Sequence, residues 1–266
     1  MSASEAKIML DSIEHVFTAA DAEPVRALEP VTMEIPEGRF ISVIGPSGCG
    51  KSTLFNIIAG LEVPTGGRVI VDDTDVTGMI GIVAYMLQKD LLLQWRTILD
   101  NVILGMELQG VPVAEARKRA EPFLSRYGLG GFENKYPSEL SGGMRQRAAL
   151  LRTMLYDSEI MLLDEPFGAL DAQTRTQMQE WLLQLWDDFG KTVLFVTHDV
   201  EEAVFLSDEI YVMAARPGRV KAVLDVPLPR PRAKHMALEP AFIAIKERCI
   251  ELLSEEAQTL SAVEAA

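Results

Sequence analysis

Cysteine is scarce in this chain, and long apolar runs are absent. Only two of the 266 residues are cysteines, Cys49 and Cys249, and they lie 200 positions apart. This count excludes a disulfide-stapled scaffold and is typical of a reduced, cytosolic protein. No stretch reaches the roughly 18 consecutive apolar residues that a transmembrane helix needs. The first seven residues lack the apolar core of a secretory signal. We therefore expect a cytosolic chain of one large or two small domains.

Basic residues are also in short supply. The chain has 25 Lys and Arg against 39 Asp and Glu, which gives a net charge of −14. Such an excess of acid argues against a large nucleic-acid footprint and against broad adhesion to anionic lipid. The stretch 216–234 is the local exception, with Arg216, Arg219, Lys221, Arg230, Arg232 and Lys234. We interpret it first as a solvated face and second as a contact with a partner or a lipid surface.

A glycine-rich motif is the most specific feature that is present. The segment fits the phosphate-binding pattern G-x-x-x-x-G-K-[ST] in full, with Gly45, Pro46, Ser47, Gly48, Cys49, Gly50, Lys51 and Ser52, followed by Thr53. An apolar run at 39–44 predicts a strand before it, and 52–59 predicts a helix after it, which Gly60 ends. Backbone N–H groups and the helix N-terminus then face a phosphate chain. Lys51 is expected to reach the β- and γ-phosphates, and Ser52 to ligate Mg²⁺. At Cys49, a small residue that fits the loop is favoured over an oxidation-sensitive site.

A second motif ends another expected strand. Four apolar residues at 160–163 predict a buried parallel strand, and Asp164 and Glu165 follow at its carboxyl end. Open α/β sheets place ligand sites at that end. Asp164 is suited to hold Mg²⁺, and Glu165 is suited to deprotonate the attacking water. Alone this pattern would favour a surface turn, but beside a phosphate loop the functional interpretation is the stronger one.

A third motif begins a helix. Ser141 is a natural N-cap, and apolar residues then recur at helical spacing from Met144. Gly142 and Gly143 expose backbone N–H groups that can bind an anion. The segment is therefore interpreted as a second phosphate-binding helix end, with a capped helix that binds nothing as the alternative.

Together these motifs resemble the ATP-binding cassette (ABC) ATPases. Leu140 to Arg147 looks like their signature motif, with Met144 where many members have Gln, and the first two motifs look like Walker A and Walker B. The resemblance implies further site residues in order along the chain: Gln88 as the Q-loop glutamine and a Mg²⁺ ligand with Ser52 and Asp164, Asp171 in the D-loop, and His198 as the switch histidine. Phe17 resembles the adenine-stacking aromatic, although a buried strand phenylalanine fits that position nearly as well.

The spacing excludes some relatives and points to one branch. Ninety residues separate Lys51 from Ser141, which leaves no room for the long coiled coil of the chromosome-maintenance and repair relatives. The segments at 91–102 and 215–220, followed by Pro229 to Arg232, look like those of nitrate/sulfonate/taurine-type import cassettes, with Gln94 where that branch usually has Pro. The function implied is the ATP-hydrolysing motor of an importer. A soluble cassette ATPase in nucleic-acid repair or translation is the alternative.

The expected fold class is α/β, with a P-loop NTPase core whose mainly parallel sheet is flanked by helices. Residues 1–38 suggest an N-terminal antiparallel β layer, and about 90–155 an inserted helical subdomain that carries the signature. We expect strands at 160–164, 192–197 and 209–213. The tryptophans and leucines at 181–186 are interpreted as core. The ATPase domain is expected to span 1–235, and 236–266 to form a polar helical tail with a frayed end.

The resemblance also implies how the chain assembles. Two cassettes would face head to tail, so that Ser141 and Gly143 of one contact the γ-phosphate that Lys51 of the other holds. The cofactors implied are ATP and Mg²⁺. The partners implied are a second cassette subunit, transmembrane permease subunits and, indirectly, an extracytoplasmic substrate-binding protein, with no nucleic acid. The location implied is the cytoplasmic face of the cell membrane, as a peripheral subunit.

Overall fold

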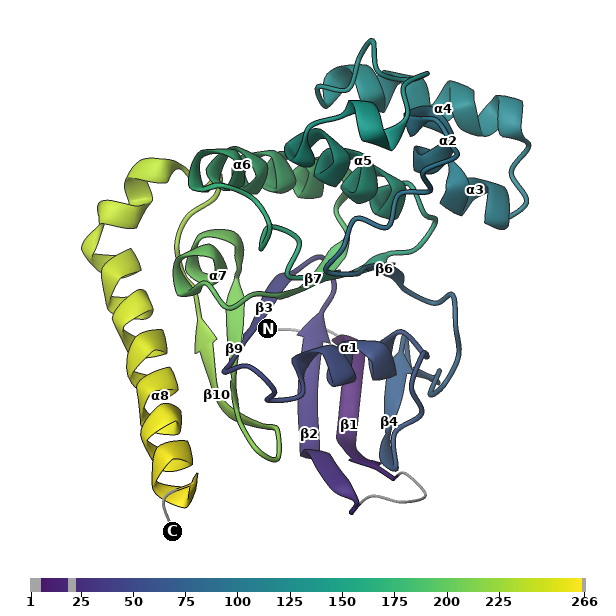
Figure 1. Ribbon diagram of the computed structural model, residues 1–266. Coiled ribbons are helices and arrows are strands. Elements are labelled where there is room, and N and C mark those ends of the chain that lie inside the picture. Colours follow the sequence, from purple (N-terminus) through teal and green to yellow (C-terminus); the bar gives the residue numbers. More distant parts are fainter. Residues whose placement is uncertain (1–5, 19–22, 265–266) are drawn as a thin grey trace. The chain divides into compact units, whose positions relative to one another are not determined.

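The chain folds into two compact units, which we describe separately. The computed structural model describes residues 6–18 and 23–264. The first unit comprises residues 1–83 and 191–266, and the second comprises residues 84–190 (Figure 1). The second unit extends beyond the helical subdomain expected at about 90–155, because it also contains two strands and the long helix α6. The domain boundaries expected from the sequence remain predictions.

The antiparallel β layer expected near the N-terminus is present in the first unit. Strands β1 (Ala6–Phe17) and β2 (Val25–Pro36) pair antiparallel, and the sheet continues to β4 (Gly66–Val71) and β5 (Thr74–Asp75) in the order β2-β1-β4-β5. Alternate residues of β2 are buried, among them Val31, Met33 and Ile35, because successive side chains of a strand point to opposite faces. The alternation in the sequence therefore reports a sheet with one buried face.

The same unit contains most of the parallel core. Strand β3 (Phe40–Ile44) lies between β8 (Thr192–Val196) and β9 (Glu209–Ala214) and is parallel to both, whereas β10 (Arg219–Asp225) pairs antiparallel with β9. Every residue of β3 and β8 is buried, as expected for parallel strands covered on both faces. Helix α1 (Lys51–Ile58) follows β3, and α7 (Val200–Leu206) follows β8 and packs on β3.

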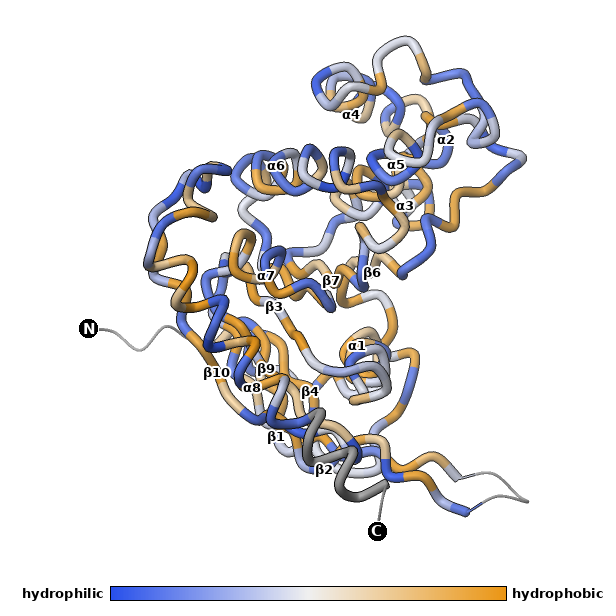
Figure 2. The backbone as a smooth tube through the Cα atoms, turned by 60° about the vertical axis from the view of Figure 1, so that its left-hand side comes forward, coloured by the Kyte–Doolittle hydropathy of each residue, from blue (hydrophilic) through white to orange (hydrophobic). Residues whose placement is uncertain are grey.

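The C-terminal helix packs on the outside of this unit. A short 3₁₀ helix, η2 (Lys234–Leu238), leads into α8 (Pro240–Glu264), which packs against α7, β9 and β10 (Figure 1). The expectation of a polar tail is wrong, because α8 buries Phe242, Cys249 and Leu252. Figure 2 shows apolar and polar residues interleaved along the helix, which is the pattern of an amphipathic helix with one buried face.

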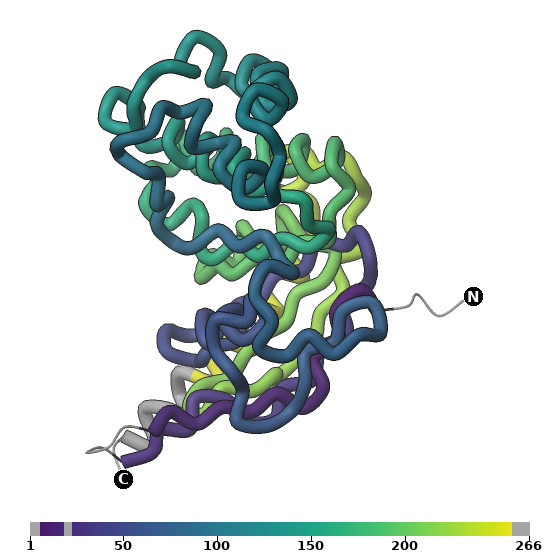
Figure 3. Tube along the Cα trace, turned by 90° about the vertical axis from the view of Figure 1, so that its right-hand side faces the viewer, coloured from purple at the N-terminus to yellow at the C-terminus, as the bar shows by residue number. Residues whose placement is uncertain are grey.

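The second unit combines two strands with a helical lobe. Strands β6 (Ala84–Met86) and β7 (Ile160–Asp164) pair in parallel. Between them lie α2 (Ile98–Val102), α3 (Leu104–Leu108), α4 (Val113–Arg126), the 3₁₀ helix η1 (Pro137–Glu139) and α5 (Gly142–Met154), gathered in one lobe and coloured teal to green in Figure 3. Helix α6 (Ala172–Phe189) follows β7 and buries Trp181, Leu182, Leu185 and Trp186. These four residues are core, as predicted.

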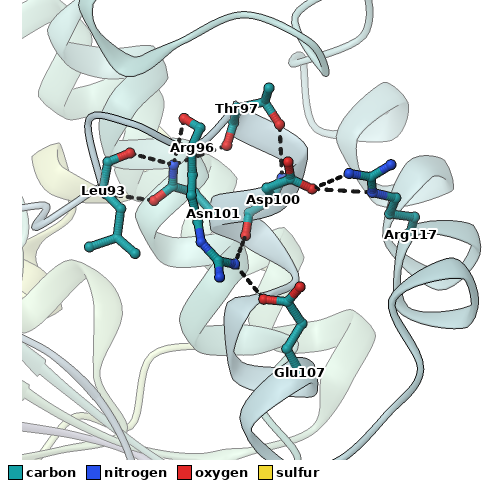
Figure 4. A network of polar contacts seen from close by, with 7 residues as sticks. All are labelled: Leu93, Arg96, Thr97, Asp100, Asn101, Glu107 and Arg117. Carbon is teal, nitrogen blue, oxygen red and sulfur yellow. Dashed lines mark hydrogen bonds and ion pairs between the residues drawn. The ribbon is translucent and has the colours of Figure 1, made fainter.

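One buried amide organises the loop after β6. The side chain of Asn101 is fully buried and donates to the carbonyl oxygens of Leu93, Arg96 and Thr97 at 2.9–3.1 Å, while its own oxygen accepts from the Leu93 N–H at 2.7 Å (Figure 4). Ion pairs Arg96–Glu107 and Arg117–Asp100 surround it. The loop is thus held from within, yet it leaves Trp95 74% exposed.

No helix among residues 6–18 and 23–264 is both long enough and apolar enough to cross a membrane.

Candidate functional site

The phosphate loop has the backbone that its glycines predict. Gly48 and Gly50 have φ angles of 77° and 89°, in the left-handed region that favours glycine. Close contacts also leave no space for a side chain at two of the glycines. A Cβ on Gly45 would lie 2.8 Å from the Met213 carbonyl oxygen, and one on Gly50 would lie 2.5 Å from Leu28 Cδ2. The loop is therefore packed tightly against its surroundings, and its shape depends on glycine.

Lys51 occupies the centre of this loop. It is the first residue of α1 and is only 8% exposed. Its ammonium group donates to the carbonyl oxygens of Gly45 at 2.8 Å and Pro46 at 3.1 Å. Ser52, the next residue, is exposed at the N-terminal turn of the helix. The arrangement offers one cation, one hydroxyl and the positive end of a helix to an anion.

Cys49 is fully buried within the loop, with Lys51 Nζ 3.6 Å from its sulfur. Burial raises the pKa of the thiol and outweighs the opposing effect of the Lys51 charge. A buried thiol that stays protonated is a poor target for oxidants. The structure thus favours the interpretation of Cys49 as a small residue that fits the loop.

The acidic pair lies at the carboxyl end of β7 in the second unit. Asp164 is 7% exposed, and the hydroxyl of Tyr85 lies 3.5 Å from its Oδ2. Burial and the Asp164 charge raise the pKa of Tyr85, so this hydroxyl stays protonated and donates. Glu165 has a φ angle of 45°, which is strained for a residue with a side chain and is often found at functional sites.

Gln88 and Glu165 are brought together although 77 positions separate them. The Gln88 amide Nε2 donates to Glu165 Oε2 at 3.3 Å. Parallel pairing of β6 with β7, with Met86 opposite Leu163, brings the two carboxyl ends to the same edge. An amide and two carboxylates thus gather at one strand edge, which is a set of oxygen donors suited to Mg²⁺ and of acceptors suited to a water proton.

The third motif forms the helix start that its residues predict. Ser141 caps α5, and its hydroxyl accepts from the Met144 N–H at 3.3 Å. Ser141 and Gly142 are exposed. A Cβ on Gly143 would lie 2.8 Å from Thr174 Cγ2, so α6 comes too close for a larger residue. The helix end is capped and accessible, and its contact with a nucleotide of a second chain stays a prediction.

Asp171 performs a local structural task. It caps α6, and its carboxylate accepts from the Thr174 N–H at 3.0 Å and from the Thr174 hydroxyl at 2.6 Å. These hydrogen bonds lower the pKa of Asp171. Asp171 therefore fixes Thr174 beside Gly143, while the D-loop role implied by the resemblance stays a prediction.

His198 follows β8 and is exposed. The residues on either side of it are fixed by hydrogen bonds. The buried hydroxyl of Thr197 donates to Glu202 Oε2 at 2.5 Å and accepts from the Asp199 N–H at 3.0 Å. Asp199 in turn caps α7 by accepting from the N–H groups of Glu201 and Glu202. The sequence motifs do not identify Thr197 and Glu202. A polar residue that ends a buried strand before a capped helix is the signal that points to them.

Phe17 lies at the end of β1 and is 44% exposed. Its ring meets that of His15 edge to face at 4.5 Å. The alternative interpretation, a buried strand phenylalanine, is wrong, because the strand runs beyond the packed part of the sheet at this point. Adenine stacking on Phe17 stays a prediction.

The basic stretch is the expected solvated face only in part, because Arg216, Arg219 and Lys234 are exposed and the other three cations are not. Arg230 pairs with Asp208 at 2.8 Å, and Lys221 pairs with Glu256 at 3.0 Å. Arg232 is 8% exposed and donates to the Ser207 carbonyl oxygen at 2.8 Å. Burial, helped by Arg230, lowers the pKa of Arg232 to about 10. Three of the six cations therefore attach the end of the chain to the fold, which sequence position alone did not reveal.

Comparisons with known proteins agree with this geometry. The family model described as ABC transporter matches residues 28–168. An uncharacterized ABC transporter ATP-binding protein of Methanocaldococcus jannaschii is 44% identical over 94% of this chain and 92% of its own length. The taurine import ATP-binding protein TauB of Rhizobium johnstonii is 41% identical over 92% of this chain and 96% of its own.

A solved structure is similar throughout its length. The ATP-binding cassette MJ0796, solved as a dimer in a post-hydrolysis state with ADP and Pi, is 32% identical with a TM-score of 0.71, and the match covers 84% of this chain and all of that one. The motifs, the fold and both kinds of similarity lead to one conclusion: the chain belongs to the ABC transporter family, and it is an ATP-binding subunit that hydrolyses ATP.

Proposed function

We propose that this chain is the motor subunit of an importer, which couples ATP hydrolysis to the uptake of a small solute of the nitrate, sulfonate or taurine class. The observation that carries the proposal is the similarity to taurine import ATP-binding proteins, which spans more than nine tenths of both chains in the protein of Rhizobium johnstonii. The segments at 91–102 and 215–220 support the same branch.

The proposed roles follow from the family resemblance of the motifs, and the geometry within each unit supports them. Lys51 and the loop N–H groups hold the β- and γ-phosphates, and Ser141 with Gly143 contacts the γ-phosphate bound to a second copy. Glu165 accepts a proton from the water that attacks the γ-phosphorus, and ADP leaves. The strained backbone at Glu165 and its contact with Gln88 support this assignment, because both fix the carboxylate at the strand end. His198, held by its neighbours, faces the γ-phosphate.

Mg²⁺ is the metal that these residues fit. Ser52, Gln88 and Asp164 offer a hydroxyl, an amide and a carboxylate oxygen, and Mg²⁺ takes oxygen ligands, of which the ATP phosphates and water would supply the rest. No group of three or more His, Cys, Asp and Glu among residues 6–18 and 23–264 forms a cage for a metal. When bound, Mg²⁺ would neutralise charge on the phosphates.

The partners proposed are a second cassette subunit and membrane permease subunits, at the cytoplasmic face of the membrane, with an extracytoplasmic substrate-binding protein acting through them. Trp95 supports the permease contact, because it stands 74% exposed on a loop that Asn101 holds rigid. Exposed aromatic residues on a preorganised support are typical anchors of protein interfaces.

The test is uptake by the assembled transporter. We expect the chain, co-expressed with its permease and receptor, to co-purify with them and to drive uptake of labelled taurine, an alkanesulfonate or nitrate into proteoliposomes. Lys51→Ala should abolish uptake, because it removes the phosphate-binding cation. Lys118→Ala, at an exposed position of α4, is the matched control and should leave it unchanged. Uptake that survives Lys51→Ala, or a chain that never binds a permease, would refute the proposal.

A further inference from the structure

A second turn of the first unit lies beside the phosphate loop. Strands β3 and β9 are parallel neighbours, with Ile44 opposite Val212. Parallel strands deliver the chain to the same edge of the sheet, so the turn 215–218 that follows β9 emerges next to the loop that follows β3. This placement follows from topology and was not visible in the sequence, where about 170 positions separate the two segments.

The turn is fastened against the loop. A Cβ on Gly218 would lie only 2.1 Å from the Cys49 carbonyl oxygen, so the two backbones are in direct contact. Gly218 also bonds to β2, because its N–H donates to the Ala27 carbonyl oxygen and its own carbonyl oxygen accepts from the Glu29 N–H, both at 2.9 Å. The position of Arg216, two residues earlier, is therefore well determined relative to the phosphate loop.

Arg216 extends its guanidinium over Gly48. A Cβ on Gly48 would lie 3.5 Å from Arg216 Nη2 and 3.8 Å from its Nε. Arg216 and Gly48 are both exposed, so the cation lies on the open side of the loop. Within the described part of the chain Arg216 makes no hydrogen bond or ion pair, whereas Arg219 forms an ion pair with Glu29, and Lys221, Arg230 and Arg232 have acceptors.

We propose that Arg216 is a further phosphate-binding residue, which contacts the phosphate chain of ATP from the β9–β10 turn. A planar guanidinium with several N–H donors matches phosphate oxygens and binds them with charge-assisted hydrogen bonds. The loop and the N-terminus of α1 already favour an anion at this place, and Arg216 adds a cation in a chain whose net charge is −14. The inference rests on the proposed binding of the nucleotide phosphates at residues 45–52.

The experiment compares nucleotide affinity in variants of the same turn. We expect Arg216→Ala to raise the Kd of ATP about tenfold, as the loss of one charge-assisted contact implies. Arg216→Lys should recover part of the affinity, because it keeps the charge but loses the planar fork. The difference between Arg216→Ala and the native chain should shrink in 0.5 M NaCl, since salt screens an exposed charge.

Arg219→Ala is the matched control, because Arg219 belongs to the same stretch and lies 3.9 Å from Glu29 instead of over the loop. We expect it to bind ATP like the native chain, with both variants melting at the native temperature. ATP affinity that is unchanged in Arg216→Ala would overturn the inference, and so would a loss of ATP-driven dimerisation at unchanged affinity, which would assign Arg216 to the subunit interface. If the native chain failed to bind ATP, the proposed function itself would fall, which is a different outcome.

Discussion

At the scale of the residue, the site consists of side chains whose positions are fixed by hydrogen bonds and by backbone geometry. Lys51 is buried and donates to loop carbonyl oxygens, which phosphate oxygens must replace when a nucleotide binds. Glu165 is held at a strained φ angle with Gln88 3.3 Å away. Such strain persists only where the surrounding structure imposes it, and it is found preferentially where chemistry needs a fixed group.

The acidic residue offers the sharpest prediction at this scale. Glu165→Gln should retain ATP binding but lower the rate of hydrolysis by about 10²- to 10⁴-fold, because an amide cannot accept the proton of the attacking water. Phosphate release measured at saturating ATP tests this. Glu121→Gln, at an exposed position of α4, is the control and should keep the native rate. Native turnover in Glu165→Gln would show that another group is the base.

At the scale of the element, two segments are held by polar contacts that their own sequence does not announce. The loop after β6 depends on the buried amide of Asn101, which serves both donors and acceptors of the backbone (Figure 4). Helix α8 is attached to β10 through Lys221, which lies 3.0 Å from both Glu255 and Glu256 and donates to the Leu252 carbonyl oxygen. In both cases one side chain joins segments that are distant in the sequence.

Replacing Asn101 should loosen the loop that carries Trp95. Asn101→Leu keeps the branched shape but leaves the Leu93 N–H and the Arg96 carbonyl oxygen without their partner, whereas the carbonyl oxygens of Leu93 and Thr97 keep backbone donors. We expect this to cost about 2–4 kcal/mol of unfolding free energy. Urea denaturation followed by tryptophan fluorescence measures the loss. Asn134→Leu, at an exposed position of the same unit, should change the unfolding free energy by less than about 0.5 kcal/mol. Equal stability of the two variants would contradict the structural role of Asn101.

The attachment of α8 should depend on pH. Burial opposes the charge on Lys221, but the hydrogen bonds and charges of Glu256 and Glu255 outweigh it, so the pKa of Lys221 is raised. The Lys221 hydrogen bond lowers the pKa of Glu255. A lysine whose pKa is raised in the folded state contributes stability that is lost as pH rises through that pKa. A carboxylate whose pKa is lowered in the folded state contributes stability that is lost as pH falls through that pKa. The contribution is therefore complete between about pH 4.5 and 10.

Lys221→Met tests this pH window. At pH 7 we expect it to lower the melting temperature by about 2 °C. The difference from the native chain should shrink as pH falls through the lowered pKa of Glu255, where this carboxylate takes up a proton. Arg248→Met is the matched control, because its ion pair with Glu251 lies within α8 and joins no second element. A difference that stayed constant from pH 7 to pH 3.5 would refute the electrostatic account.

At the scale of the whole molecule, each chain carries only part of the proposed site. The signature helix start and the phosphate loop belong to different compact units, and Ser141 is capped and exposed. The similar solved cassette is described as a dimer with ADP and Pi. We infer that ATP joins two copies of this chain, because two nucleotides held between them add contacts that the free chains lack.

Sedimentation velocity tests this assembly. Glu165→Gln with ATP should sediment as a dimer, and without nucleotide as a monomer or a weak dimer. Adding Ser141→Arg to that variant should block the shift, because the long cation would occupy the γ-phosphate position. Ser254→Arg, on the exposed side of α8, is the control and should dimerise normally. A monomer with full ATPase activity at every concentration would refute the sandwich.

The sequence by itself determined the local chemistry. The phosphate loop, the strand that ends in Asp164, the Ser141 cap and the core of α6 were all readable, because each depends on neighbours within a few positions and on periodicities of 2 or 3.6 residues. The family resemblance followed from six motifs in order along the chain.

Only the tertiary structure decided which distant residues meet. Parallel pairing brought Gln88 to Glu165 and the Arg216 turn to Gly48. Packing of α8 against the first unit buried one face of a helix that the sequence suggested was polar. The basic stretch looked solvated, yet Arg230 and Arg232 hold the end of the chain in place. Parallel neighbouring strands are connected through long crossovers, and the two members of an ion pair can come from distant segments. Local sequence patterns therefore predict neither the strand pairing nor the ion pairs.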